Sequence, residues 1–132
     1  MRTFALQLNG ARQSTRIDNV VSFVGEDASG RFGLRAGHER FMTPLVFGLA
    51  RYRPADSEWR YLALPGALLY FAGHELVINA RRYIEDTDYH RISRALTEQL
   101  LKEEEVLVGL KQNLRQLEEA MLKQLLNIEQ GR

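Results

Sequence analysis

The 132-residue sequence contains no cysteine, which excludes disulfide bonds, thiol catalysis and thiolate metal sites. It also lacks a long apolar run, because every hydrophobic stretch is far shorter than the roughly 20 residues that a membrane-spanning helix needs. The N-terminus shows neither the extended apolar region nor the small-residue cleavage site of a signal peptide. We therefore expect a soluble, cytosolic protein without direct membrane insertion.

Catalytic residue types are also scarce. The three histidines are His38, His74 and His90, and the first two each precede a glutamate. Neighbouring residues of a strand point to opposite faces, so a His-Glu pair offers a metal only one side chain, and we interpret both as turn residues. No serine has a nucleophile-elbow context, and no glycine-rich loop has phosphate-binding spacing. The sequence therefore predicts no catalytic residue, no metal and no cofactor.

The sequence has no segment in which basic residues cluster. The formal net charge is +1, and the basic residues are scattered along the sequence. Binding to a phosphate backbone requires a basic patch or stripe. We therefore expect no nucleic-acid partner.

Lysine is missing before residue 87 and proline is missing after residue 86. The first 86 residues hold all six phenylalanines, the one tryptophan and eight of the ten glycines, whereas the rest is rich in Leu, Glu, Gln and Lys. This break predicts a β-sandwich domain at 1–86 and a helical hairpin domain at 87–132. The first part carries enough aromatic residues for a core of its own.

Short apolar stretches in the first part alternate with turn residues about every 8–12 positions, which is typical of strands. We expect strands at 4–8, 20–24, 46–52, 59–64, 67–71 and 76–80. The links between the last four of these strands are short, as between antiparallel neighbours. The fold class is therefore mainly β plus α, with an N-terminal antiparallel β-sandwich or barrel and a C-terminal α-helical hairpin.

The second part begins with Asp86-Thr87-Asp88, whose side-chain oxygens can cap a helix. Apolar residues then recur every three or four positions from Leu107 to Leu125, which places them on one helix face. Three consecutive glutamates at 103–105 and Gly109 mark the place where a helix is easiest to interrupt. We expect an antiparallel helix pair, with one long helix as the alternative.

Residues 30–45, GRFGLRAGHERFMTPL, resemble a signature of the epsilon subunit of bacterial F-type ATP synthases, in which glycines, an aromatic residue and a Gly-His pair precede an apolar-Thr-x-Leu run. Residues 61–68 and 76–80 resemble the next strands of that family, and Asp88 and Arg91 match its Asp-x-x-Arg helix start. Arg31 stands where many relatives have an acidic residue.

This resemblance implies a non-catalytic rotor subunit at the cytoplasmic face of the bacterial inner membrane. Its partners would be the gamma subunit, the loops of the c-ring and, through the helices, the alpha/beta catalytic hexamer, whose ATP hydrolysis they would inhibit. The family analogy names Arg31, Phe32 and His38 as partner-binding residues. It also implies turns at Gly30, Gly33 and Gly37.

Asp88 and Arg91 are also nucleotide candidates, because some relatives bind ATP through this helix start. Glu98 stands where a further arginine would be expected. The competing class is a free-standing interaction module, a β-sandwich with a coiled-coil arm that serves another assembly.

Overall fold

The computed structural model describes residues 2–130 and contains a nine-stranded sheet followed by helix. Its elements are β1 (Phe4–Asn9), β2 (Ser14–Asp27), β3 (Gly30–Arg35), β4 (Phe41–Leu45), β5 (Gly48–Pro54), β6 (Arg60–Leu64), β7 (Ala67–Ala72), β8 (Glu75–Asn79), β9 (Ile84–Asp86), α1 (Tyr89–Ala95), the π-helical segment η1 (Leu96–Leu101) and α2 (Lys102–Gln130).

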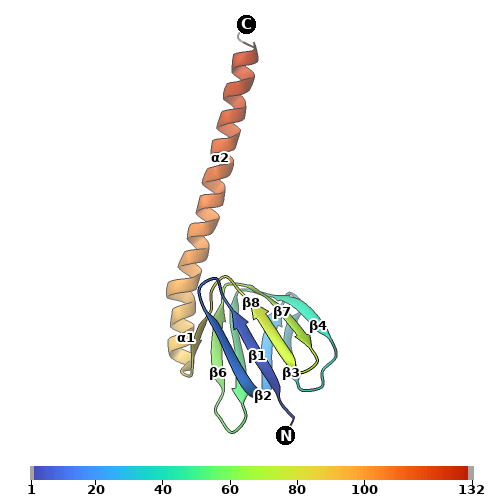
Figure 1. The fold of residues 1–132 in the computed structure, drawn as a ribbon. Helices are drawn as coiled ribbons and strands as arrows, with labels where there is room; N and C mark the ends of the chain where they lie inside the picture. Colours follow the sequence, from blue (N-terminus) through green and yellow to red (C-terminus); the bar gives the residue numbers. More distant parts are fainter. Residues whose placement is uncertain (1, 131–132) are drawn as a thin grey trace. The chain divides into compact units, whose positions relative to one another are not determined.

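The strands follow the order β1-β8-β7-β4-β2-β5-β6-β9, and β3 pairs with β2. Figure 1 shows these strands as the β part of the chain. The long strand β2 joins the two layers, since its first half pairs with β1 and its second half lies between β3 and β5. Neighbours are antiparallel, with the parallel pair β1–β8 as the exception. The predicted β-sandwich is confirmed.

The core consists of every second residue along each strand, the ones whose side chains face inward. Phe4, Leu6 and Leu8 on β1 are buried, as are Leu76 and Ile78 on β8. The Phe4 and Phe71 rings meet edge to face, with 5.5 Å between centroids. All buried members of this cluster precede β9, so the sandwich has its own core.

A second, smaller cluster lies on the outside of the sandwich, where α1 packs against β6 and β9. It contains Ala63, Ile92 and Leu100, which are fully buried. Asp88 begins α1 by accepting hydrogen bonds from the backbone N–H groups of His90 (2.8 Å) and Arg91 (3.2 Å). The predicted cap is therefore present at Asp88.

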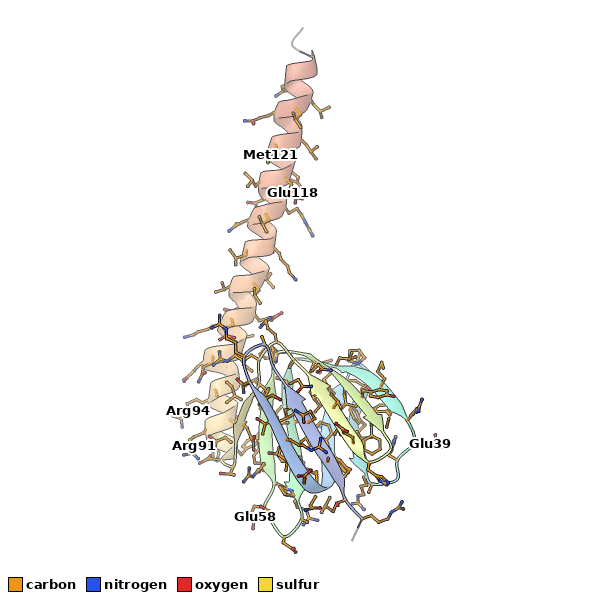
Figure 2. All side chains as sticks on the ribbon, in the orientation of Figure 1. Glu39, Glu58, Arg91, Arg94, Glu118 and Met121 are labelled. Carbon is orange, nitrogen blue, oxygen red and sulfur yellow. The ribbon has the colours of Figure 1, made fainter. Side chains whose placement is uncertain are left out.

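The predicted helical hairpin is wrong, and the alternative of one long helix is what the structure has. Helical residues continue without a turn from Tyr89 to Gln130, and Figure 2 shows Arg91 and Arg94 on α1 and Glu118 and Met121 on α2. The irregularity that was expected near Gly109 lies earlier, as the π-helical segment η1. Glu103–105 lie inside this continuous helical stretch, where glutamate is a good helix former, and Gly109 remains helical.

The chain divides into two compact units between Leu100 and Leu101. The first unit therefore contains α1 and most of η1 in addition to the sandwich. The second unit, taken by itself, is α2. Its apolar side chains, including Leu110, Leu114 and Met121, are exposed.

Candidate partner-binding surfaces

Strand β3 carries two of the three predicted partner-binding residues, but on opposite faces. Its burial alternates, so that Phe32 and Leu34 face the core while Arg31 and Arg35 are exposed on the outer face. The tight turn before β3 is formed at Gly30, whose φ of 126° suits glycine. Gly33 lies within the strand, so the turn expected there is wrong.

His38 follows β3 in a turn that Gly37 makes possible with its φ of 86°. The imidazole Nδ1 lies 2.8 Å from the carbonyl oxygen of Glu39. The ring meets Phe41 edge to face at 5.7 Å, and Phe41 in turn meets Phe32 at 5.2 Å. The structure therefore brings Phe32 and His38 to a shared aromatic neighbour, whereas Arg31 lies on the other side of β3.

An uncharged surface that sequence reasoning missed covers the outer side of β4, β7 and β8. We call it the apolar face, and it consists of Met42, Pro44, Leu68, Tyr70 and Val77. Met42 is 59% exposed and Leu68 is 44% exposed. Cross-strand register places Met42 opposite Tyr70, Pro44 opposite Leu68 and Tyr70 opposite Val77. The available signal was the run 67–71, which is apolar on both faces of its strand.

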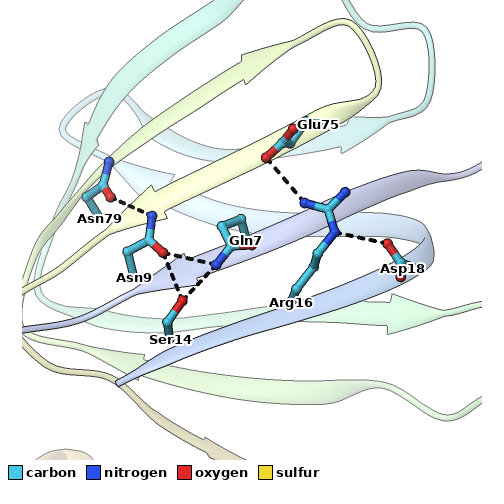
Figure 3. A network of polar contacts seen from close by, with 7 residues as sticks. All are labelled: Gln7, Asn9, Ser14, Arg16, Asp18, Glu75 and Asn79. Carbon is cyan, nitrogen blue, oxygen red and sulfur yellow. Dashed lines mark hydrogen bonds and ion pairs between the residues drawn. The ribbon is translucent and has the colours of Figure 1, made fainter. Parts of the chain in front are cut away.

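Polar side chains of β1, β2 and β8 border this apolar face, since Gln7 lies opposite Val77 in the sheet register, and Figure 3 shows the contacts among these polar residues. The Asn9 side chain donates a hydrogen bond to Asn79 (3.0 Å), and the Gln7 amide donates to Ser14 (2.8 Å). An exposed ion-pair network continues along the same border, where Arg16 contacts both Asp18 (3.2 Å) and Glu75 (3.5 Å). An apolar centre with a polar rim is the usual anatomy of a protein–protein interface.

The two nucleotide candidates at the start of α1 are engaged within the chain. Arg91 donates two hydrogen bonds to Asp86, from Nε to Oδ2 at 3.0 Å and from a terminal nitrogen to Oδ1 at 2.9 Å. The Asp88 backbone N–H also donates to Asp86 (2.9 Å). These bonds, the Arg91 bonds above all, lower the pKa of Asp86. Asp88 caps α1 and Arg91 binds Asp86, so both have structural roles here.

One buried polar group links β5, β6 and β9. The Tyr52 hydroxyl donates to Glu85, which also accepts from Arg60 at 3.0 Å. Burial, followed by the Glu85 contact, raises the pKa of Tyr52 well above its ordinary value. The Tyr52 hydroxyl therefore stays protonated beside the Arg60–Glu85 ion pair and cannot act as a general base.

Among the described side chains, those of residues 2–127, no group of three or more His, Cys, Asp or Glu could hold a metal ion. In the same range, no helix has the length and apolar character to span a membrane. The apolar face and its polar rim are instead suited to contact with another macromolecule.

Comparison with known proteins gives a family match over the sandwich. Residues 3–86 match the family model described as ATP synthase, Delta/Epsilon chain, beta-sandwich domain. Over 83 residues the chain is 32% identical to ATP synthase epsilon chain 2 of Cereibacter sphaeroides, covering 62% of this chain and 57% of that relative. The chain thus spans little more than half the length of this relative.

Two solved structures share the fold. One is from the Euglena gracilis mitochondrial ATP synthase OSCP/F1/c-ring assembly, with a TM-score of 0.59 and 18% identity over 73% of this chain and 62% of that chain. The other is from the Tetrahymena thermophila mitochondrial ATP synthase central stalk and c-ring, with a TM-score of 0.54 and 10% identity over 63% of this chain and 66% of that chain.

Proposed function

Because the chain belongs to the family of ATP synthase delta/epsilon-chain β-sandwich domains, we propose that it is a non-catalytic central-stalk subunit of an F-type ATP synthase. In this role it binds the gamma subunit, contacts the c-ring loops and couples ion flow to ATP synthesis. It acts as a peripheral subunit at the cytoplasmic face of a bacterial inner membrane. The neighbouring folds in ATP synthase central-stalk and c-ring assemblies support this assignment.

The apolar face is the observation that carries the proposal. Five uncharged residues adjoin one another on β4, β7 and β8 beside a polar rim; Met42, Pro44 and Leu68 are exposed, and Tyr70 and Val77 are half-buried. Exposed apolar patches of this kind mark sites of protein contact. We assign this face to the gamma subunit. The helix α2, which is exposed along its leucine-rich side, is the element that would reach the catalytic hexamer and inhibit ATP hydrolysis.

The test is binding of the purified chain to the gamma subunit of the same complex. The wild-type chain should form a one-to-one complex at micromolar concentration. Replacing Met42 and Leu68 by glutamate should weaken binding at least about tenfold, because each new carboxylate would lose its hydration at the interface. The control variant A11E/S57E adds the same two charges at exposed turns outside the apolar face.

No complex with the wild-type chain would remove the rotor assignment. Equal binding of M42E/L68E and A11E/S57E would keep the partner and move its binding site away from the apolar face.

A further inference from the structure

The sheet register gathers arginines that are scattered in the sequence. On the outer face of the second layer, β2 presents Ser22 and Val24 between the arginines of its two neighbours. Ser22 lies opposite Arg35 of β3 on one side and opposite Arg53 of β5 on the other. We call the surface formed by Arg31, Arg35, Arg51 and Arg53 around Ser22 and Val24 the arginine trough.

The trough is hollowed along β2. Arg35, Arg53 and Trp59 line a hollow of about 310 Å³ at the end near Ser22. Arg31 and Arg51 line a second hollow of about 240 Å³ near Val24. A third hollow shares Ser22 and Arg35 with the first and Val24 with the second, so it adjoins both. The floor is low because Gly33, opposite Val24, has no side chain.

The charge of the trough is strongly unbalanced. The outward-facing residues of β3, of β5 and of the half of β2 between them (residues 22–27) include four arginines and one acid, Glu26, which gives this face a formal charge of 4 − 1 = +3, against +1 for the whole chain. None of the four guanidinium groups forms an ion pair with any of the side chains that the structure describes, which are those of residues 2–127. Arg51 instead lies over the Trp59 ring, 4.5 Å from its centroid. The guanidinium groups therefore remain available to an anion.

Carboxylates fit the geometry of these groups. Each arginine can bind a carboxylate with two parallel hydrogen bonds. Arg51 and Arg53 are two residues apart on one strand, about 7 Å, which is also the spacing of side chains i and i+2 in an extended peptide. Arg35 and Arg53 lie across two strand spacings, about 9.5 Å. The strip between them carries the small side chains of Ser22 and Val24, with Glu26 at one end, and its first part can receive a backbone.

We propose that the arginine trough binds an acidic, extended segment of a partner protein, with carboxylates at alternate positions. This contact lies on the opposite layer from the apolar face and goes beyond the binding of gamma described above. A phosphate backbone is a poorer occupant, since the trough spans only about 13 Å along β2 and offers few phosphate contacts.

Trp59 provides the measurement, because it is the one tryptophan of the chain and lies in the trough. Its fluorescence would be titrated with a ten-residue peptide that alternates Glu and Ser, and with the matched peptide that alternates Gln and Ser. The acidic peptide should give a saturable change at 0.05 M salt. The change should disappear at 1 M salt, where the screening length falls to about 3 Å.

The variant R35Q/R53Q should bind the acidic peptide about five- to tenfold more weakly. The control R12Q/R40Q removes two exposed arginines outside the trough and changes the net charge equally, and its binding should remain unchanged. Circular dichroism would establish that both variants are folded. If R35Q/R53Q does not fold, R31Q/R51Q would replace it, and its binding would be measured by the fluorescence anisotropy of a labelled peptide.

Equal weakening by both variants, or equal binding of the Glu and Gln peptides, would overturn the proposal. Tighter binding of a ten-nucleotide oligo(dT) or of phosphatidylserine vesicles than of the acidic peptide would overturn it in favour of a phosphate-bearing partner. Gamma binding provides the separate control: R35Q/R53Q should retain it, and loss of gamma binding in this variant would assign the trough to gamma instead.

Discussion

At the scale of single residues, the carboxylate of Asp86 determines how α1 is joined to the sandwich. It belongs to the last strand, β9, yet it accepts hydrogen bonds from Arg91 in the first turns of α1 and from the Asp88 backbone. Asp88 caps the same helix end. Asp88 and Arg91, which the family resemblance names as nucleotide-binding candidates, thus stabilise the start of α1.

Replacing Arg91 by glutamine should raise the pKa of Asp86, because the largest cause of its lowered pKa is the Arg91 hydrogen bond. A carboxyl with a lowered pKa in the folded state stabilises that state above its unfolded pKa of about 3.9, and this stability is lost as pH falls through the folded pKa. The melting temperature of R91Q should therefore lie below that of the wild type at pH 7, and the two should converge near pH 2.

Carbon-detected NMR titration of Asp86 gives the pKa directly. The control R94Q removes another exposed arginine of α1 with the same change of charge (Figure 2). An unchanged Asp86 titration in R91Q would contradict the structural role of the pair.

The predicted c-ring contact also belongs to this scale. Arg31 and His38 are exposed and lie on different sides of the β3 region, so a contact that uses both must wrap around the strand. Replacing both by alanine should weaken the coupling of ATP hydrolysis to ion pumping while the fold is kept, since exposed substitutions usually cost within about 0.5 kcal/mol. Proton or sodium pumping by reconstituted enzyme measures this, and unchanged coupling would exclude the contact.

At the scale of elements, the strands followed from the sequence more closely than the helices did. Alternation identified the regions of β1 and β5 to β8, but β3 and β4 were hidden in a glycine-rich signature that indicated turns, and β9 has only three residues. The parallel pairing of β1 with β8 has no local signal, because it depends on which edges meet after folding.

The helical region shows why the remainder could not be predicted. A lone glycine and three glutamates permit a break but do not require one, since each costs a helix at most about 1 kcal/mol. The apolar face and the arginine trough are likewise properties of register. Arg35 and Arg53 become neighbours of Ser22 only when β2 lies between β3 and β5.

Replacing Gly109 by alanine distinguishes one helix from a hairpin. An added Cβ at Gly109 meets no atom within 4 Å, and alanine in a helix interior is more stable than glycine by about 0.5–1 kcal/mol. G109A should therefore increase the ellipticity at 222 nm and its persistence on heating. A120G in the same helix should do the opposite. A loss of helicity in G109A would indicate that the chain turns at this glycine.

At the scale of the whole molecule, the chain divides after Leu100. A truncation before this point tests the stability of the first unit, and a truncation just after it tests the regulatory role of α2. Ile92 and Leu100 are fully buried against the outside of the sandwich. Removing everything after Asp88 exposes that cluster, and each lost apolar side chain is worth about 1.5–3 kcal/mol of burial. This truncated chain should melt at a lower temperature than the intact chain.

Truncation after Leu101 keeps the second cluster and removes only α2. The remaining unit should fold with nearly unchanged stability and should bind gamma as the full chain does, because the apolar face lies entirely on β4, β7 and β8. If α2 inhibits the catalytic hexamer, enzyme assembled with this truncated chain should hydrolyse ATP faster than enzyme with the full chain.

A helix in a protein gains most of its stability from the surface against which its apolar side packs. The apolar side of α2 is exposed at Leu110, Leu114, Leu117 and Met121. A helix of this kind can exchange between binding places whose free energies differ by only a few kcal/mol, which is what a regulatory switch requires. Replacing Leu114 and Leu117 by glutamine, with Gln112 and Gln116 replaced by asparagine as the control, should reproduce the rise in hydrolysis seen on truncation. Equal hydrolysis by the full-length, truncated and substituted chains would leave α2 a role in assembly alone.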